Sequence, residues 1–202
     1  MPPNNTNSVL LSVGSDCVIF DAWGRASDWI DLLKKRSLNL CAIYSTHGHP
    51  DHISAAPELS EYFNIPWYMN YSDIPMIEWG SGLLNFFELD PIKKDYKKPE
   101  DLKDGFYEIL SLPVRIIELP GHSAGGVAFY FQAERVLIVG DTIFQESIGR
   151  YDLPGSNLEQ LKKSISKIYN MNLSDDTVVV FGHGPHSTIG ELKNNNSYFQ
   201  SK

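Results

Sequence analysis

The sequence predicts an α/β protein built of two β-sheets that are covered by helices. Three observations support this fold class. Short apolar runs of strand length occur in blocks, segments of helical periodicity separate some of the blocks, and strand and helix do not alternate strictly. With 202 residues, of which 42% are hydrophobic and 21% charged, the chain is expected to fold as one domain over residues 1–202.

The chain begins with a predicted β-hairpin. Apolar runs at 8–13 and 17–20 are separated by the turn-forming residues Gly14, Ser15 and Asp16. A helix is expected over 26–37, where apolar residues share one helical face and Ser27 stands in the place of an N-cap. A third strand is expected at 40–45.

The middle of the chain is harder to interpret. A helix is expected over 53–64, with Pro57 in its first turns, and a strand at 65–70. Residues 71–112 are rich in aromatic residues and contain the charged run KKDYKK. We expect an irregular insert there.

Regular structure returns in the C-terminal half. Runs at 114–119, 126–131 and 135–140 have strand length and are rich in β-branched and aromatic residues. Residues 157–170 carry a leucine and isoleucine face of helical spacing, and a last strand is expected at 177–181. Two sheets covered by helices account for this order of elements.

The histidines of this chain cluster at one kind of position. The stretch THGHPDH at 46–52 holds three of the six histidines, and two more follow other predicted strands beside glycine. A histidine taken alone is more often a surface or core residue, but residues without a common role should scatter along the chain. Functional groups gather where strand ends of a rigid scaffold converge. The candidate residues are His47, His49, His52, His122, Asp141 and His183.

The spacing within this stretch predicts a metal site. His47 and His49 are two residues apart, so in an extended segment their imidazoles point to the same side and can share one ion. Asp51 and His52, at the start of the following helix, can turn toward a second ion. Carboxylates combined with imidazoles suit zinc, manganese or iron better than copper.

Four motifs together resemble one family. THGHPDH, LPGHSAGG, VGDTIF and FGHGP are similar, in this order, to the ligand motifs of the metallo-β-lactamase superfamily, and the resemblance covers about residues 7–192. PGHSAGG and GDTIFQESIGRYDLPGS look most like its glyoxalase II-like branch, the hydroxyacylglutathione hydrolases.

The resemblance implies a fold and a ligand set. The fold would be an αββα sandwich, with two mixed β-sheets and helices on the outer faces. Two divalent ions would be bound, with zinc expected and iron or manganese also suitable. The first ion would be held by His47, His49 and His122, the second by Asp51, His52 and His183, and Asp141 would bridge them.

The implied activity is hydrolysis of a thioester or ester. Water between two divalent ions loses a proton at neutral pH, and the resulting hydroxide attacks the carbonyl while the ions stabilise the oxyanion. Asp51 is the candidate catalytic side chain that orients this nucleophile, and S-lactoylglutathione is the first substrate to test. Asp21 is expected to form hydrogen bonds around the ligands.

The chain also departs from the glyoxalase II pattern. Only 19 residues follow His183, so we expect the helical extension that helps to bind glutathione to be lacking. Arg150 is a candidate for binding a substrate carboxylate, and a salt bridge with Asp152 is an equal alternative. His186 is expected to be a surface or packing residue.

A second branch of the same family offers an alternative. The GRxD spacing of residues 149–152 resembles the persulfide dioxygenases, which hold one iron with two histidines and an aspartate. The ligands would then be His49, His122 and Asp141, a set that suits non-haem iron.

The net charge and the N-terminal sequence limit the expected classes of partner and the expected location. A net charge of −8 argues against nucleic-acid binding and nuclease activity, since these need a basic face. The sequence begins with no secretory signal and contains no apolar run of membrane-spanning length, so cytoplasmic residence is expected and β-lactamase activity is disfavoured. The expected partner is a small acyl thioester or ester. We expect no nucleic-acid partner and no membrane partner, and the sequence leaves open whether the chain forms a homodimer.

Overall fold

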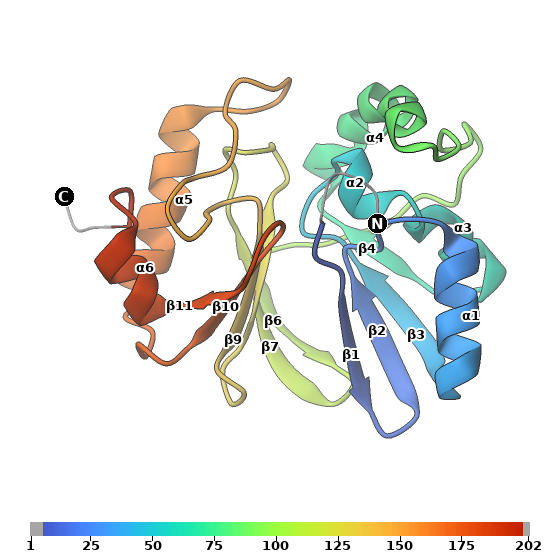
Figure 1. Ribbon diagram of the computed structural model, residues 1–202, viewed down its shortest axis with the longest axis horizontal. Coiled ribbons are helices and arrows are strands. Elements are labelled where there is room, and N and C mark those ends of the chain that lie inside the picture. The colour runs from blue at the N-terminus through green and yellow to red at the C-terminus, as the bar shows by residue number, and fades with distance from the viewer. Residues whose placement is uncertain (1–5, 200–202) are drawn as a thin grey trace. The chain divides into compact units, whose positions relative to one another are not determined.

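The computed structural model describes residues 6–199, which fall into two compact units with a boundary between Leu102 and Lys103. Each unit contains one mixed β-sheet, its own helices and its own hydrophobic core (Figure 1). The predicted fold class, α/β with two mixed sheets and covering helices, is confirmed. The single domain over residues 1–202 stays a prediction.

The first unit holds a five-stranded sheet of order β1-β2-β3-β4-β5. β1 and β2 form the predicted antiparallel hairpin, and β2 to β5 are parallel neighbours. Its elements are β1 (Val9–Val13), β2 (Asp16–Phe20), α1 (Ala26–Arg36), β3 (Asn39–Tyr44), α2 (Pro50–Ile53), α3 (Ala56–Tyr62), β4 (Trp67–Met69), the 3-10 helix η1 (Tyr71–Asp73), α4 (Ile74–Ser81), the 3-10 helix η2 (Gly82–Phe87) and β5 (Glu100–Asp101).

The core of the first unit joins the helices to one face of this sheet. Ile19 and Ile43 point from β2 and β3 into the same cluster as Leu33 of α1 and Leu59 of α3, and all four side chains are buried. Burial of each such side chain contributes about 1.5–3 kcal/mol. The packed sheet therefore supplies a rigid base for the segments that leave its strand ends.

Two helix predictions in this unit need correction. The first helix begins at Ala26, so Ser27 lies inside the first turn, and Arg25 is the N-cap residue without a side-chain cap. The helix expected over 53–64 is interrupted: α2 ends at Ile53, and α3 begins at Ala56 with Pro57 in its first turn. Proline lacks the amide proton that a continuous helix would need there.

The insert expected over 71–112 is more ordered than predicted. It contains α4, a helix with Pro75 in its first turn and Gly80 in its last, a composition with weak helical propensity. The insert also ends early, because residues 105–109 form a strand. Only Ile109 of that strand is buried, so it lacks the apolar alternation by which a strand is recognised.

The second unit holds a six-stranded sheet of order β11-β10-β9-β8-β7-β6. Only β9 and β10 are parallel, and the other neighbours are antiparallel. Its elements are β6 (Gly105–Ile109), β7 (Leu112–Glu118), β8 (Val127–Phe131), β9 (Val136–Gly140), α5 (Leu158–Asn170), β10 (Val178–Phe181), β11 (Ser187–Thr188) and α6 (Ile189–Asn195).

Helices α5 and α6 pack on one face of the second sheet. Leu161 and Ile165 of α5 share a core cluster with Val139 and Phe181 of the central strands. Asn157 caps α5, since its side chain accepts a hydrogen bond from the backbone amide of Gln160 at 3.0 Å. The predicted helix over 157–170 is thus confirmed, with its start shifted by one residue.

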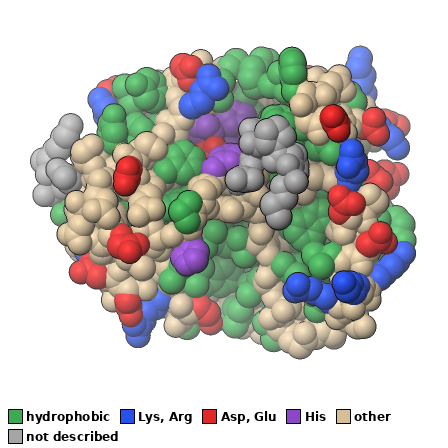
Figure 2. Space-filling model, viewed as in Figure 1, with side chains coloured by type: hydrophobic (Ala, Val, Ile, Leu, Met, Phe, Trp, Pro, Cys, Tyr) green, Lys and Arg blue, Asp and Glu red, His purple; other side chains and the backbone are tan. Residues whose placement is uncertain are grey.

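The structure also shows the length and apolar character of the helices and the distribution of charged side chains on the surface. Within residues 6–199, no helix combines the length and apolar character needed to cross a bilayer. Figure 2 shows acidic and basic side chains interspersed on one face of the molecule.

Candidate metal centre

Four candidate ligands lie in one short segment of the first unit, which we call the histidine loop (residues 46–52). The loop follows β3 directly, and its second part is helix α2, which begins at Pro50. His49 has an extended backbone at the N-cap of α2. Potential ligand atoms of His47 and His49 lie within 4.8 Å of each other, and so do those of His47 and His52. The prediction that His47 and His49 can share an ion agrees with this geometry.

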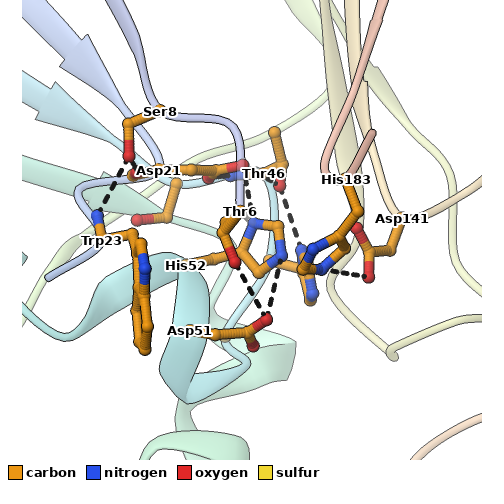
Figure 3. Close-up of polar contacts among 12 residues, drawn as sticks. Thr6, Ser8, Asp21, Trp23, Thr46, Asp51, His52, Asp141 and His183 are labelled. Atoms are coloured by element: carbon orange, nitrogen blue, oxygen red, sulfur yellow. Dashed lines mark hydrogen bonds and ion pairs between the residues drawn. The ribbon is translucent and has the colours of Figure 1, made fainter. Parts of the chain in front are cut away.

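Asp21 anchors the histidine loop from the end of β2. Its carboxylate accepts hydrogen bonds from the Thr46 amide at 2.7 Å, the Thr46 hydroxyl at 2.8 Å and His52 Nδ1 at 2.9 Å (Figure 3). Asp21 is 2% exposed and has a left-handed backbone with φ of 53°. The expectation that Asp21 forms hydrogen bonds around the ligands is confirmed.

These bonds also fix the protonation pattern of two imidazoles. His52 donates from Nδ1 to the Asp21 carboxylate. The Thr46 hydroxyl donates to Asp21, so it accepts from His47 Nδ1 at 3.0 Å. In neutral histidine only one nitrogen carries the proton, so Nε2 of both rings presents a lone pair. A lone pair is what a metal ligand must offer.

Asp51 completes the group of the first unit. Its Oδ2 lies 3.8 Å from His52 Nε2 and accepts a hydrogen bond from the Thr6 hydroxyl at 3.2 Å (Figure 3). Asp51 and His52 sit in the first turn of α2, as predicted from the spacing.

The second unit brings three candidate ligands together from three loops. His122, Asp141 and His183 follow β7, β9 and β10. One atom, Asp141 Oδ2, lies 3.6 Å from His122 Nε2 and 3.4 Å from His183 Nε2. Ligands about 2.1 Å from a tetrahedral ion are separated by roughly 3.4 Å, so these spacings suit a bound zinc or a similar ion.

A backbone carbonyl group holds His122 of the second unit. His122 Nδ1 donates to the carbonyl oxygen of Arg150 at 2.8 Å, which leaves Nε2 as the ligand atom. Gly149 allows this close packing, because a Cβ there would lie 1.9 Å from the Asp141 carbonyl oxygen and 3.0 Å from His122 Nδ1. The glycine beside Arg150 is therefore a steric requirement of the site.

The remaining candidates lie on the surface. Arg150 forms a two-pronged salt bridge with Asp152, at 2.9 Å for each contact, so the alternative of an internal ion pair is confirmed. The hydrogen bond from Arg150 lowers the pKa of the Asp152 carboxyl from its ordinary value. Substrate binding by Arg150 stays a prediction. His186 is exposed, as expected.

The donor set fits divalent metal ions. Four candidates gather in the first unit and three in the second, and both groups combine imidazole with carboxylate, which suits zinc, iron or manganese. Supporting contacts from Thr6, Thr46 and Asp73 were not predicted. Thr46 is the first residue of the motif at 46–52, whereas Thr6 and Asp73 are far from it in sequence and give no signal.

Comparisons with known proteins indicate one family. A family model described as the metallo-beta-lactamase superfamily matches residues 1–183. A relative from Haemophilus influenzae, named hydroxyacylglutathione hydrolase GloC, is 35% identical over 204 residues, covering 96% of this chain and 92% of the relative.

Two solved structures are similar over almost the whole chain. The BLEG-1 B3 metallo-β-lactamase has a TM-score of 0.84 at 33% identity and covers 98% of this chain and 96% of its own. TTHA1623 in a di-iron-bound form has a TM-score of 0.86 at 31% identity, with 98% and 97% covered.

Proposed function

Because the chain belongs to the metallo-β-lactamase superfamily, we propose that it is a metal-dependent hydrolase of thioesters or esters, with hydroxyacylglutathione as the first substrate class. One observation carries the proposal. In His47, His52 and His122 the Nδ1 atom is engaged in a hydrogen bond, so that each ring offers Nε2 to an ion. Three imidazoles oriented in this way suit a metal centre, in which a neighbouring group holds Nδ1 and Nε2 binds the ion.

The proposal assigns the candidate ligands to two ions. His47, His49 and His122 hold the first, Asp51, His52 and His183 hold the second, and Asp141 is shared. Asp141 Oδ2 suits a shared position, since it lies beside two imidazole nitrogens of its own unit. That the groups of the two units meet at one centre is part of the proposal.

Two divalent ions bound by these residues would supply hydroxide at neutral pH and stabilise a developing oxyanion. The protein's own residues orient this chemistry. Asp51 is the proposed residue that directs the nucleophile, and Thr6 holds one of its carboxylate oxygens. Zinc is the expected metal, with iron next, because TTHA1623 has a di-iron form.

The substrate class follows from the relative in Haemophilus influenzae, whose name states hydroxyacylglutathione hydrolase activity. Arg150 is the proposed contact for a substrate carboxylate, which would replace Asp152 as the partner of the guanidinium. A small-molecule partner, no nucleic acid or membrane partner, and cytoplasmic residence complete the proposal, and a homodimer stays open.

The decisive experiment combines metal analysis with parallel assays of purified protein. We expect about two metal equivalents per chain and hydrolysis of S-lactoylglutathione, both reduced by Asp141→Ala. Protein that carries two metals yet hydrolyses none of a panel of thioesters and esters would contradict the proposal.

A second candidate is an iron-dependent persulfide dioxygenase that uses His49, His122 and Asp141. It is favoured by the Gly149, Arg150 and Asp152 spacing, and the backbone of this segment holds His122 in place. It predicts one iron and oxygen uptake with glutathione persulfide. Iron-loaded protein that consumes no oxygen would exclude it.

A further inference from the structure

A buried carboxylate from the insert reaches the histidine loop. Asp73 is 0% exposed and lies at the junction of η1 and α4. Its Oδ2 accepts a hydrogen bond from the backbone amide of Gly48 at 2.9 Å. Gly48 is the residue between His47 and His49, so the carboxylate holds the backbone between two candidate ligands.

Asp73 also stands at the N-cap of α4 without capping it. Aspartate at this position ordinarily accepts a hydrogen bond from an amide of the first turn, and such a cap contributes about 1 kcal/mol. Asp73 makes no side-chain cap bond to α4. Its carboxylate is directed to the histidine loop instead, at a cost to the stability of its own helix.

Helix α4 and its N-cap residue Asp73 contact the histidine loop on both sides of His49. A Cβ on Gly48 would lie 2.7 Å from the Asp73 carbonyl oxygen and 2.9 Å from the Asp73 Cβ. A Cβ on Gly80 would lie 2.7 Å from Pro50 Cδ. Both glycines are needed for this contact between α4 and the segment that carries His49.

We propose that Asp73 is a positioning residue that orients His47 and His49 for metal binding. Glycine has the largest backbone freedom of any residue, so the peptide between the two histidines needs an external anchor. The Asp73 carboxylate supplies it through the hydrogen bond that it accepts from the Gly48 amide. The inference rests on the proposed metal binding and gives the first part of the insert a function.

The test uses three variants of the full chain and measures zinc affinity by competition with a chromophoric chelator. Asp73→Ser retains an oxygen that can cap α4, but this oxygen is one bond closer to the backbone than the Oδ2 atom that accepts from Gly48. Asp73→Asn keeps an acceptor at the original distance. Asp101→Ser is the matched control, because the exposed Asp101 accepts a bond from the Tyr71 amide at 3.0 Å on the same insert.

We expect Asp73→Ser to weaken zinc binding by about 10- to 100-fold, as loss of a supporting residue does at metal sites. Asp73→Asn should restore affinity to within about threefold of the wild type, and Asp101→Ser should stay within the same range. Wild-type affinity in Asp73→Ser overturns the inference. Equal losses of zinc affinity in Asp73→Ser and Asp73→Asn also overturn the inference. Equal losses in Asp73→Ser and Asp101→Ser do the same.

A second measurement does not depend on the folding of any variant. In the metal-free wild type, the Gly48 amide should be protected from hydrogen exchange, and fast exchange overturns the inference. Failure of the proposed function looks different. Wild-type protein that binds no zinc contradicts the metal centre, whereas zinc binding unaffected by Asp73→Ser contradicts only the role of Asp73.

Discussion

The two units supply candidate ligands in different ways. The first provides four from seven consecutive residues, anchored by the carboxylates of Asp21 and Asp73. The second provides three from the ends of three strands, and the carbonyl oxygen of Arg150 holds His122. One group is local in sequence, and the other exists only when the sheet has formed.

This difference locates the weak points of each group. Side-chain carboxylates support the histidine loop, so a single polar substitution can disturb it. In the second unit the carbonyl oxygen of Arg150 holds His122, so a sensitive position there is Gly149, where an added methyl group has no room. The predictions that follow test this distinction.

The largest effect is expected at Asp141, the residue that lies near two histidines of the second unit. Asp141→Ala should lower turnover by roughly three orders of magnitude and reduce the metal content, because on the proposed assignment both ions would lose a ligand. Metal analysis and the thioesterase assay check this. Asp176→Ala, at an exposed ion pair with Arg135, is the control and should behave as wild type.

The next effect is expected at Asp21. Asp21→Ala removes the acceptor of three hydrogen bonds and leaves the buried Thr46 amide unsatisfied, so the free energy of unfolding should fall by about 3 kcal/mol. Denaturant unfolding of the metal-free protein measures it. A change below about 1 kcal/mol would show that the histidine loop does not depend on this carboxylate.

Gly149 tests the corresponding support in the second unit. Gly149→Ala forces a methyl group against the Asp141 carbonyl oxygen, and the unfolding free energy should drop by about 1–3 kcal/mol. Gly82→Ala is the matched control, because a Cβ at Gly82 meets nothing within 4 Å. Thermal unfolding measures the stability of both variants. Equal stability would contradict the steric argument.

The smallest effect concerns the surface pair of Arg150 and Asp152. Arg150→Ala should raise the pKa of Asp152 toward its ordinary value, because the hydrogen bond that lowers it is lost. Because the pKa of Asp152 is lower in the folded state, the ion pair stabilises the folded state at pH values above the ordinary aspartate pKa. This contribution disappears as pH falls through the folded-state pKa. A carboxyl NMR titration measures the shift, and the pKa of Asp176, lowered by hydrogen bonds from Ser174 and from Arg135, should not move.

Much of the fold was predictable because its signals are local. Strands β2, β3, β8 and β9 and helix α5 have apolar patterns that agree with their burial. α4 and β6 were missed for the opposite reason. The first contains proline and glycine, and the second buries only one residue, so neither has a pattern that its sequence could reveal.

The candidate ligands were predictable for a similar reason, and their supports were not. Histidines placed after strands are visible in a sequence, and so is the loop motif at 46–52. The contact between Gly48 and Asp73 spans 25 residues, and the contact between His122 and Arg150 spans 28. Such contacts are set by how helices and loops pack on the sheets, which residue type and spacing alone do not specify.

The boundary at Leu102 has a consequence for biosynthesis. Chains fold from the N-terminus as they leave the ribosome, and a compact unit can form before the remainder is made. The histidine loop, with Asp21 and Asp73, belongs entirely to this early unit, whereas His183 is the last candidate ligand to be translated. The four candidate ligands of the histidine loop and both of their carboxylate anchors are therefore synthesised before His122, the first candidate ligand of the second unit.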